Sequence, residues 1–300
     1  MTVRAAHRAP AADGGAWQAA IVDIDGTLVL GDPQGHGYRA LPGAPALLAA
    51  IRAAGLRLAA FTNGTLHTNA DYVSLLTQAG LDIAEHEVFT PANVAAHWYR
   101  GRGLKRVLVL GGAGVRQPLR DAGLEVALPE DGDAAVAVDE VLVGWHPEFR
   151  LADLEVACRA VWAGARLGTT SNARFFASRG GRMIGVSNAI AAGITSTTGV
   201  RARVFGKPSA LAMRTVLAHL DAPASRTVVI GDDPTLEIAM GRQAGARAIG
   251  VLTGIGTAET FAAARAERRA DAVFDDAAGV AAWLSAGAAG AAGAAVRRTP

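Results

Sequence analysis

Short runs of aliphatic residues alternate along this 300-residue chain with longer segments in which apolar residues recur every three or four positions. The short runs are typical of buried strands, and the longer segments are typical of amphipathic helices. Their alternation predicts an α/β fold in which right-handed crossovers connect the strands of a parallel sheet. The predicted strands cover residues 19–24, 56–61, 227–230, 247–251 and 272–274, and the predicted helices cover residues 44–54, 69–79, 209–219 and 237–244.

The middle of the chain repeats this alternation on a smaller scale. Strands are predicted at 106–110, 137–143 and 166–169, and helices at 114–122 and 151–163. We therefore expect a smaller α/β lobe at residues 102–199, inserted into a discontinuous core of residues 1–101 and 200–285. Residues 286–300 belong to an alanine- and glycine-rich run, and we expect a disordered tail because glycine opposes a stable helix.

Two aspartates directly follow the first predicted strand. The segment IVDIDGTL places Asp23 and Asp25 one residue apart, and Gly26 then starts a turn. Such a turn can bring both carboxylates to the mouth of a parallel sheet, where ligands of open α/β sheets bind. The ordinary alternative is a strand end with two solvated acids. Because a close pair of carboxylates needs a cation or hydrogen-bond donors, the pair indicates phosphoryl chemistry.

Three more polar segments follow predicted strands. Residues 62–64, with the sequence TNG, offer a hydroxyl, an amide and backbone N–H groups to an anion. Lys207 stands between a glycine and a proline, which restrict the backbone and direct one ammonium group. Residues 232–237 contain three acids whose oxygens suit Mg²⁺. Taken singly, the three segments would be interpreted as an ordinary strand-to-helix turn, a surface lysine and an acidic helix cap.

In this order and at these strand ends, the four motifs resemble those of the haloacid dehalogenase (HAD) superfamily of phosphohydrolases. The resemblance extends from about Ala19 to about Leu284 and is closest to subfamily IIA, the NagD-like and p-nitrophenyl-phosphatase-like branch. The segments similar to that branch are FTNGT, VLVLGGAGV, VLVGWHPEF, GTTSNARF, SNAIAAGI and VFGKPS. The resemblance implies a HAD-like doubly wound parallel-sheet (Rossmann-like) core, with the inserted smaller α/β lobe as a type C2 cap domain.

The resemblance also implies a catalytic role for several motif residues. Asp23 would be the nucleophile that becomes an aspartyl-phosphate, and Asp25 would be the general acid and base. Thr62, the Asn63 backbone and Lys207 would hold the remaining phosphoryl oxygens, where negative charge develops during the reaction.

The implied cofactor is Mg²⁺. The resemblance assigns it to the Asp23 carboxylate, the Asp25 backbone carbonyl and Asp232, with waters completing the octahedron. Asp233 and Glu237 would support the site by orienting metal waters or the catalytic lysine.

The chain departs from the usual pattern of this branch at two motif positions and in one loop. Gly64 stands where a second asparagine is common, and Glu237 stands where an aspartate is usual. In the cap, Asn172, Arg174 and Phe175 are the candidates for contacts with the substrate, but their loop lacks the acid and the prolines usual in the branch. Arg174 either binds a second anion on the substrate or faces solvent.

These observations predict a Mg²⁺-dependent phosphatase that hydrolyses a small phosphorylated metabolite through an aspartyl-phosphate. Sugar phosphates, nucleotides and pyridoxal phosphate-like compounds are the expected substrate classes. One alternative is a small-ligand binding or regulatory protein that has kept the fold and lost turnover, and a phosphomutase is another. A dinucleotide site at residues 111–114 is disfavoured, because the fingerprint lacks its third glycine and the acid that would bind a ribose.

Composition restricts the partners. The net charge is only +2, and lysine and arginine are scattered, so nucleic-acid binding has little support. No stretch of the sequence approaches a membrane span. The single cysteine, Cys158, excludes an intramolecular disulfide and is expected as a core thiol in a reducing cytoplasm. The resemblance adds a possible homodimer formed through the cap.

Overall fold

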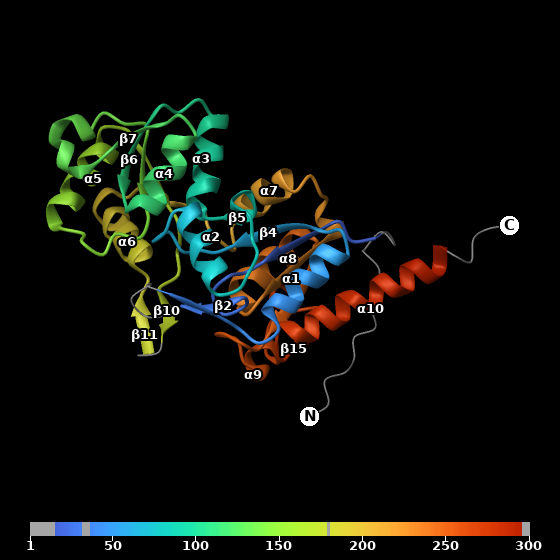
Figure 1. Ribbon diagram of the computed structural model, residues 1–300. Coiled ribbons are helices and arrows are strands. Elements are labelled where there is room, and N and C mark those ends of the chain that lie inside the picture. The colour runs from blue at the N-terminus through green and yellow to red at the C-terminus, as the bar shows by residue number, and fades with distance from the viewer. Residues whose placement is uncertain (1–15, 32–36, 179–180, 296–300) are drawn as a thin grey trace. The chain divides into compact units, whose positions relative to one another are not determined.

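The computed structural model describes residues 16–31, 37–178 and 181–295 (Figure 1). The chain divides into two compact units. Unit 1 comprises Met1–Phe61, Val73–Val88 and Val216–Pro300, and unit 2 comprises Thr62–Tyr72 and Phe89–Thr215. The lobe predicted at residues 102–199 lies inside unit 2, which also takes in the segment that follows residue 61.

Unit 1 contains a six-stranded sheet in the order β15-β14-β13-β1-β4-β5. Strand β1 runs parallel to both β4 and β13, and β14 runs parallel to β13 and β15. The order reverses beside β1, as expected for a doubly wound sheet, and ligands bind such sheets at this switch point. The strands are β1 (Ala19–Val22), β4 (Arg57–Phe61), β5 (Val88–Phe89), β13 (Thr227–Gly231), β14 (Arg247–Val251) and β15 (Ala272–Phe274).

The four helices predicted for the core are present as α1 (Ala44–Ala53), α2 (Asn69–Gln78), α7 (Ala210–His219) and α8 (Ala239–Ala244), and the division into units runs through α2 and α7. Helices α9 (Ala258–Ala262) and α10 (Ala277–Ala295) were not predicted. A short antiparallel hairpin, β2 (Val29–Gly31) and β3 (Tyr38–Ala40), precedes α1. The helix predicted at 237–244 starts only at Ala239, because a π-helical turn, Pro234–Ile238, comes first.

The prediction of a disordered tail was wrong for residues 286–295. Helix α10 continues to Ala295 and packs against α1, beside which it lies in Figure 1. Its first half is anchored by the buried side chains of Val280, Trp283 and Leu284. Starting a helix is the costly step, and an anchored, alanine-rich helix extends past single glycines with little further cost. Residues 296–300 of the predicted tail lie outside the described residues.

Unit 2 contains a five-stranded sheet in the order β12-β9-β8-β6-β7, and all of its strand pairs are parallel. The strands are β6 (Arg106–Leu110), β7 (Glu125–Ala127), β8 (Glu140–Val143), β9 (Arg166–Thr169) and β12 (Arg203–Val204). The helices are α3 (Pro91–Gly101), α4 (Ala113–Asp121), α5 (Leu151–Trp162) and α6 (Val186–Thr198), and β10 (Phe175–Ser178) and β11 (Gly181–Ile184) form an antiparallel hairpin. The predicted alternation in this lobe is therefore confirmed.

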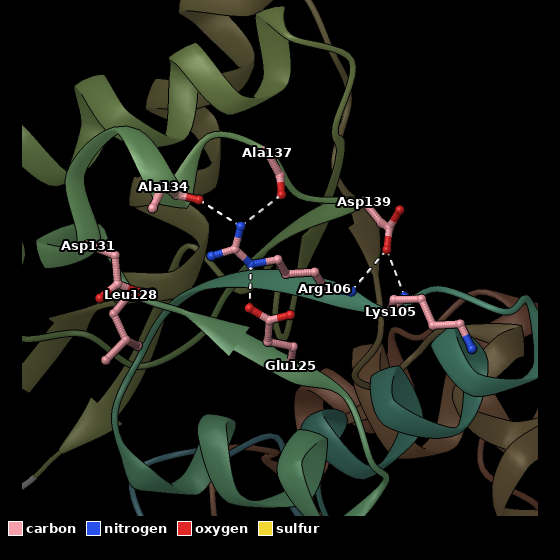
Figure 2. Close-up of polar contacts among 8 residues, drawn as sticks. All are labelled: Lys105, Arg106, Glu125, Leu128, Asp131, Ala134, Ala137 and Asp139. Atoms are coloured by element: carbon pink, nitrogen blue, oxygen red, sulfur yellow. Dashed lines mark hydrogen bonds and ion pairs between the residues drawn. The ribbon is translucent and has the colours of Figure 1, made fainter.

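Polar contacts explain why the strand predicted at 137–143 starts only at Glu140. Figure 2 shows the Asp139 carboxylate accepting hydrogen bonds from the backbone N–H groups of Lys105 and Arg106, at 2.7 and 2.9 Å. These two donors hold the pKa of Asp139 below its usual range. The Arg106 guanidinium donates to Ala137 O and forms an ion pair with Glu125 at 2.8 Å. The Asp139 backbone still pairs with Arg106 and Arg166, whereas the Ala137 carbonyl accepts its hydrogen bond from the Arg106 side chain.

The core of unit 2 contains the single cysteine. Cys158 is 2% exposed within an aliphatic cluster between α5, α6 and the sheet, and burial raises the pKa of its thiol. Its predicted role as a packed core residue is confirmed. None of the helices among the described residues has the length and apolar character needed to cross a membrane.

Candidate active site

The first aspartate motif lies at the carboxyl end of β1, beside the switch point of the unit 1 sheet. Val22 pairs with Ala60 of β4 on one side and with Ile230 of β13 on the other. The backbone N–H of Asp23 donates to Ile230 O at 2.9 Å, which extends the ladder by one residue. The Asp23 carboxylate is buried and accepts a hydrogen bond from Thr27 Oγ1 at 3.0 Å, so its orientation is restricted.

The turn after Asp23 requires a glycine for two reasons. Gly26 has φ of +92°, a left-handed conformation that other residues adopt at a cost. A Cβ at this position would also lie 2.6 Å from Asp232 Oδ2. The carboxylate of Asp232 therefore packs directly against the turn that carries the exposed Asp25.

A loop that the sequence analysis did not single out holds these two segments together. The Ile255 N–H donates to Asp232 Oδ2 at 2.6 Å, and Gly256 N–H donates to Asp232 O at 3.0 Å. Thr253 Oγ1 donates to Gly26 O at 2.7 Å. The signal for this loop was available in the glycine-containing sequence TGIG, which follows the predicted strand 247–251 and so lies at the same edge of the sheet.

The two remaining acids of this motif support the loop after β13. Asp233 Oδ1 accepts hydrogen bonds from Thr235 N–H and Oγ1 at 2.6 and 2.7 Å, which is the helix-capping role raised as its alternative. Glu237 is buried, and its Oε2 accepts a hydrogen bond from the Asp233 N–H at 3.3 Å. A Cβ on Gly231 would run into the Glu237 side chain, so this glutamate folds back onto the backbone of its own loop.

The second motif belongs to unit 2, although Thr62 directly follows β4 in the chain. Thr62 is 1% exposed, and its Oγ1 accepts a hydrogen bond from the Gly64 N–H at 2.8 Å. At Gly64, a Cβ would run into the hydroxyl of Tyr72 and lie 3.1 Å from Thr62 Oγ1. The Tyr72 hydroxyl therefore occupies the space that a side chain at position 64, such as the expected asparagine, would need.

Lys207 lies next to this motif within unit 2. It follows the short strand β12, and its side chain is 1% exposed. Asn63 Oδ1 accepts a hydrogen bond from the Lys207 N–H at 2.7 Å, and Asn63 Nδ2 donates to Lys207 O at 3.1 Å. The structure thus brings together two predicted site residues that are 144 positions apart in the chain.

The three cap candidates lie close together in sequence in unit 2, at the start of the β10–β11 hairpin. Asn172 and Arg174 are exposed and precede the hairpin, and Phe175 is the first residue of β10 with 46% of its side chain exposed. The predicted site residues therefore form two groups, one in each unit. Unit 1 carries Asp23, Asp25, Asp232, Asp233 and Glu237, and unit 2 carries Thr62, Asn63, Gly64, Lys207, Asn172, Arg174 and Phe175.

Comparison with known families agrees with this arrangement. A model of haloacid dehalogenase-like hydrolases matches residues 20–125, and a second model of HAD-hydrolase-like proteins matches residues 204–280. The chain belongs to the haloacid dehalogenase-like hydrolases. The first match contains the Asp23 and Thr62 motifs of the hydrolase, and the second contains the Lys207 and Asp232 motifs.

Named relatives place the hydrolase in the NagD-like branch, as the resemblance implied. It is 31% identical to bovine chronophin over 253 residues, which are 81% of this chain and 83% of chronophin. It is 30% identical to the ribonucleotide monophosphatase NagD of Escherichia coli K12 over 235 residues, 78% of this chain and 87% of NagD. A glycerol phosphate phosphatase of Mycobacterium tuberculosis, solved in complex with calcium, superposes with a TM-score of 0.77 at 25% identity over 89% of this chain and 74% of that one.

The hydrolase offers hard oxygen donors for a divalent cation. The part of the chain that the structure describes has no group of three or more His, Cys, Asp or Glu side chains placed to hold a metal. Mg²⁺, however, takes only one or two carboxylates and keeps several waters. The Asp23 and Asp232 carboxylates, at the ends of adjacent strands, and the backbone carbonyl of Asp25 on the intervening turn fit that requirement.

Proposed function

We propose that this protein is a Mg²⁺-dependent phosphatase that hydrolyses a small phosphorylated metabolite through an aspartyl-phosphate on Asp23. The chain is a phosphoric monoester hydrolase of the NagD-like branch. The observation that supports the proposal most directly is the packing of the Asp232 carboxylate against the Gly26 turn, because carboxylate oxygens close to Asp23 and Asp25 are the donors that Mg²⁺ would need.

The proposed chemistry has two steps. Asp23 attacks phosphorus while the ester P–O bond breaks, and Asp25 gives its proton to the leaving oxygen. Water then attacks phosphorus, releases the Asp23 carboxylate and returns a proton to Asp25. The hydrogen bond from Thr27 to Asp23 Oδ2 restricts rotation of the nucleophile, which favours in-line attack. The exposure of Asp25 is compatible with proton exchange with solvent between turnovers.

In the proposed mechanism, the phosphoryl oxygens are bound by Thr62, the Asn63 backbone and Lys207. A buried ammonium group and fixed hydroxyl act in a site of low dielectric, where their attraction for developing negative charge exceeds that in water. When bound by Asp23, the Asp25 carbonyl and Asp232, Mg²⁺ supplies charge neutralisation for the phosphoryl oxygens.

The proposed substrate is small and is selected by the cap segment that carries Asn172, Arg174 and Phe175. Relatives named for nucleotide, glycerol phosphate and sugar phosphate substrates support this class. An exposed phenylalanine and an arginine in one segment suit a leaving group with an apolar face or a second anion.

The test is hydrolysis of p-nitrophenyl phosphate with Mg²⁺, with EDTA, and with Mg²⁺ restored after EDTA. We expect turnover only with the metal, and we expect Asp23→Asn to abolish it. Asp131→Asn, which changes an exposed acid that caps a turn in unit 2, is the matched control and should retain turnover. A parent protein without metal-dependent turnover would favour a binding or regulatory role. A screen of phosphorylated metabolites ranked by kcat/KM then identifies the substrate.

A further inference from the structure

The backbone of Lys207 is held by a side chain from a distant segment. Up to Phe205 the chain extends the unit 2 sheet, since Phe205 N–H donates to Thr169 O at 2.9 Å. Two residues later, at Lys207, the N–H and the carbonyl both pair with the Asn63 carboxamide. The amide of one residue thus takes over the two hydrogen bonds that a neighbouring strand would otherwise provide.

A carboxamide suits this pair of bonds, because it presents an acceptor and a donor on two separate atoms. Its oxygen accepts and its NH₂ group donates, whereas a carboxylate only accepts and an aliphatic side chain does neither. The packing leaves little freedom around it. A Cβ on Gly206 would run into both Asn63 Oδ1 and Thr170 O, so the glycine allows the carboxamide to reach the backbone.

We infer that Asn63 is a positioning residue for Lys207: its side chain fixes the lysine backbone so that the ammonium group meets the phosphoryl group in one orientation. This inference rests on the proposed phosphatase function. It assigns the Asn63 side chain a role separate from that of its backbone N–H. Misplacing a catalytic group by about 1 Å costs on the order of 10²-fold in rate, so two hydrogen bonds that fix a long, flexible side chain at its base have a measurable effect.

The experiment is a double-mutant cycle between the two residues. Asn63→Ala should lower kcat/KM for p-nitrophenyl phosphate by about 10²-fold. In the Lys207→Ala background, the same change should cost less than about threefold, because there is no ammonium group left to misplace. A purely structural role would instead give the same loss in both backgrounds, and this result would overturn the inference.

A matched control comes from the same unit. Asn93 Oδ1 also accepts a backbone hydrogen bond, from Thr90 N–H at 2.9 Å, but it caps helix α3. Asn93→Ala should lower thermal stability and leave kcat/KM within about twofold of the parent value. An equal loss of kcat/KM in Asn93→Ala and Asn63→Ala would contradict a specific role for Asn63.

A second variant covers the case in which Asn63→Ala does not fold. Asn63→Asp keeps the acceptor for Lys207 N–H and replaces the donor to Lys207 O with a carboxylate oxygen that repels it, so we expect a folded variant that still loses turnover. Full turnover in Asn63→Asp would refute the two-bond arrangement. If the parent itself shows no metal-dependent turnover, the proposed function fails, and calorimetric binding of inorganic phosphate to the same variants tests the inference separately: phosphate affinity should fall in Asn63→Ala only when Lys207 is present.

Discussion

The acidic and the cationic groups of the proposed site are positioned in different ways. In unit 1, Asp23 and Asp232 follow two paired strands, and their carboxylates accept hydrogen bonds from the Thr27 hydroxyl and the Ile255 backbone N–H, respectively. In unit 2, Lys207 follows a two-residue strand, and the side chain of Asn63 holds it in place. Sheet pairing thus positions the two aspartates, whereas the Asn63 carboxamide holds the backbone at Lys207. The cationic part should therefore be the easier one to disturb by a conservative substitution.

The largest loss of kcat/KM among these variants is expected from a substitution of Asp25, on the turn after β1. Asp25→Asn should lower kcat/KM by about 10²–10⁴-fold, the usual contribution of general acid–base catalysis. The loss should be smaller for p-nitrophenyl phosphate than for an alkyl phosphate, because nitrophenolate leaves without needing a proton. Steady-state kinetics with both substrates measures this difference. Asp276→Asn, at a cap of helix α10, is the control and should show no dependence on the leaving group.

The glycine of the same turn provides the next test. Gly26→Ala should lower kcat/KM by at least about 10²-fold, since the added Cβ displaces the Asp232 carboxylate. Gly55→Ala is the matched control in unit 1, because Gly55 also has a left-handed φ, +66°, but has open space around its Cβ position. Both variants should lose stability from backbone strain. Equal turnover in the two variants would show that contact with Asp232 does not matter.

Gly206 tests the cationic part in the same way. Gly206→Ala should push on the Asn63 carboxamide and lower kcat/KM about tenfold, since a partial displacement costs less than the roughly 10²-fold of a full ångström. Gly112→Ala is the control, because Gly112 lies in another strand-to-helix turn of unit 2 with φ of −81° and open space. Steady-state kinetics and thermal melts on both variants separate loss of turnover from loss of fold. A Gly206→Ala variant with parental kinetics would mean that Lys207 functions even when the Asn63 carboxamide is displaced.

The smallest effect on turnover is expected from a buried acid in unit 2. Burial raises the pKa of Glu140 from 4.5 to about 7, although the Tyr99 hydroxyl donates to its carboxylate at 2.9 Å. Because the folded state then binds the proton more tightly than the unfolded state, this group lowers stability as pH rises from about 4.5 to about 7. Glu140→Gln removes that cost, on the order of 3 kcal/mol above pH 7, and should not change turnover.

Urea unfolding of the parent and of Glu140→Gln at pH 5 and pH 8 measures this difference. The variant should gain stability over the parent at pH 8 and much less at pH 5. A gain of the same size at both pH values would show that Glu140 does not titrate as its burial implies.

The sequence predicted the sheet of unit 1 and the acidic motif well, because both depend on local patterns. The strands predicted at 247–251 and 272–274 have the observed bounds. In the D-x-D-G segment, the glycine indicates the turn that follows β1. The roles of the individual site residues remain predictions. The loop at 253–256 was missed because its contacts with Asp232 come from backbone N–H groups, so the sequence shows only its position after a predicted strand and its glycines, and not the contacts themselves.

Long-range contacts account for the other differences. Nothing local shows that the Asn63 side chain reaches Lys207, since the contact joins segments 144 residues apart. Nor does a local pattern show that Thr62–Tyr72 packs with unit 2, where Thr65 Oγ1 accepts a hydrogen bond from Trp145 N–H at 3.0 Å. The C-terminal part of α10 was missed because the low helix propensity of glycine was considered without the packing that anchors the first turns of this helix.

That packing has a practical consequence for handling the protein. Gly43 has no room for a Cβ because the backbone of Ala278 lies against it, so the first turn of α10 fits closely over the start of α1. A deletion that begins before Ala277 would remove the helix that packs against α1, and the uncovered surface should produce insoluble material. An affinity tag placed after Ala295 leaves this contact untouched and is the sensible choice for purification.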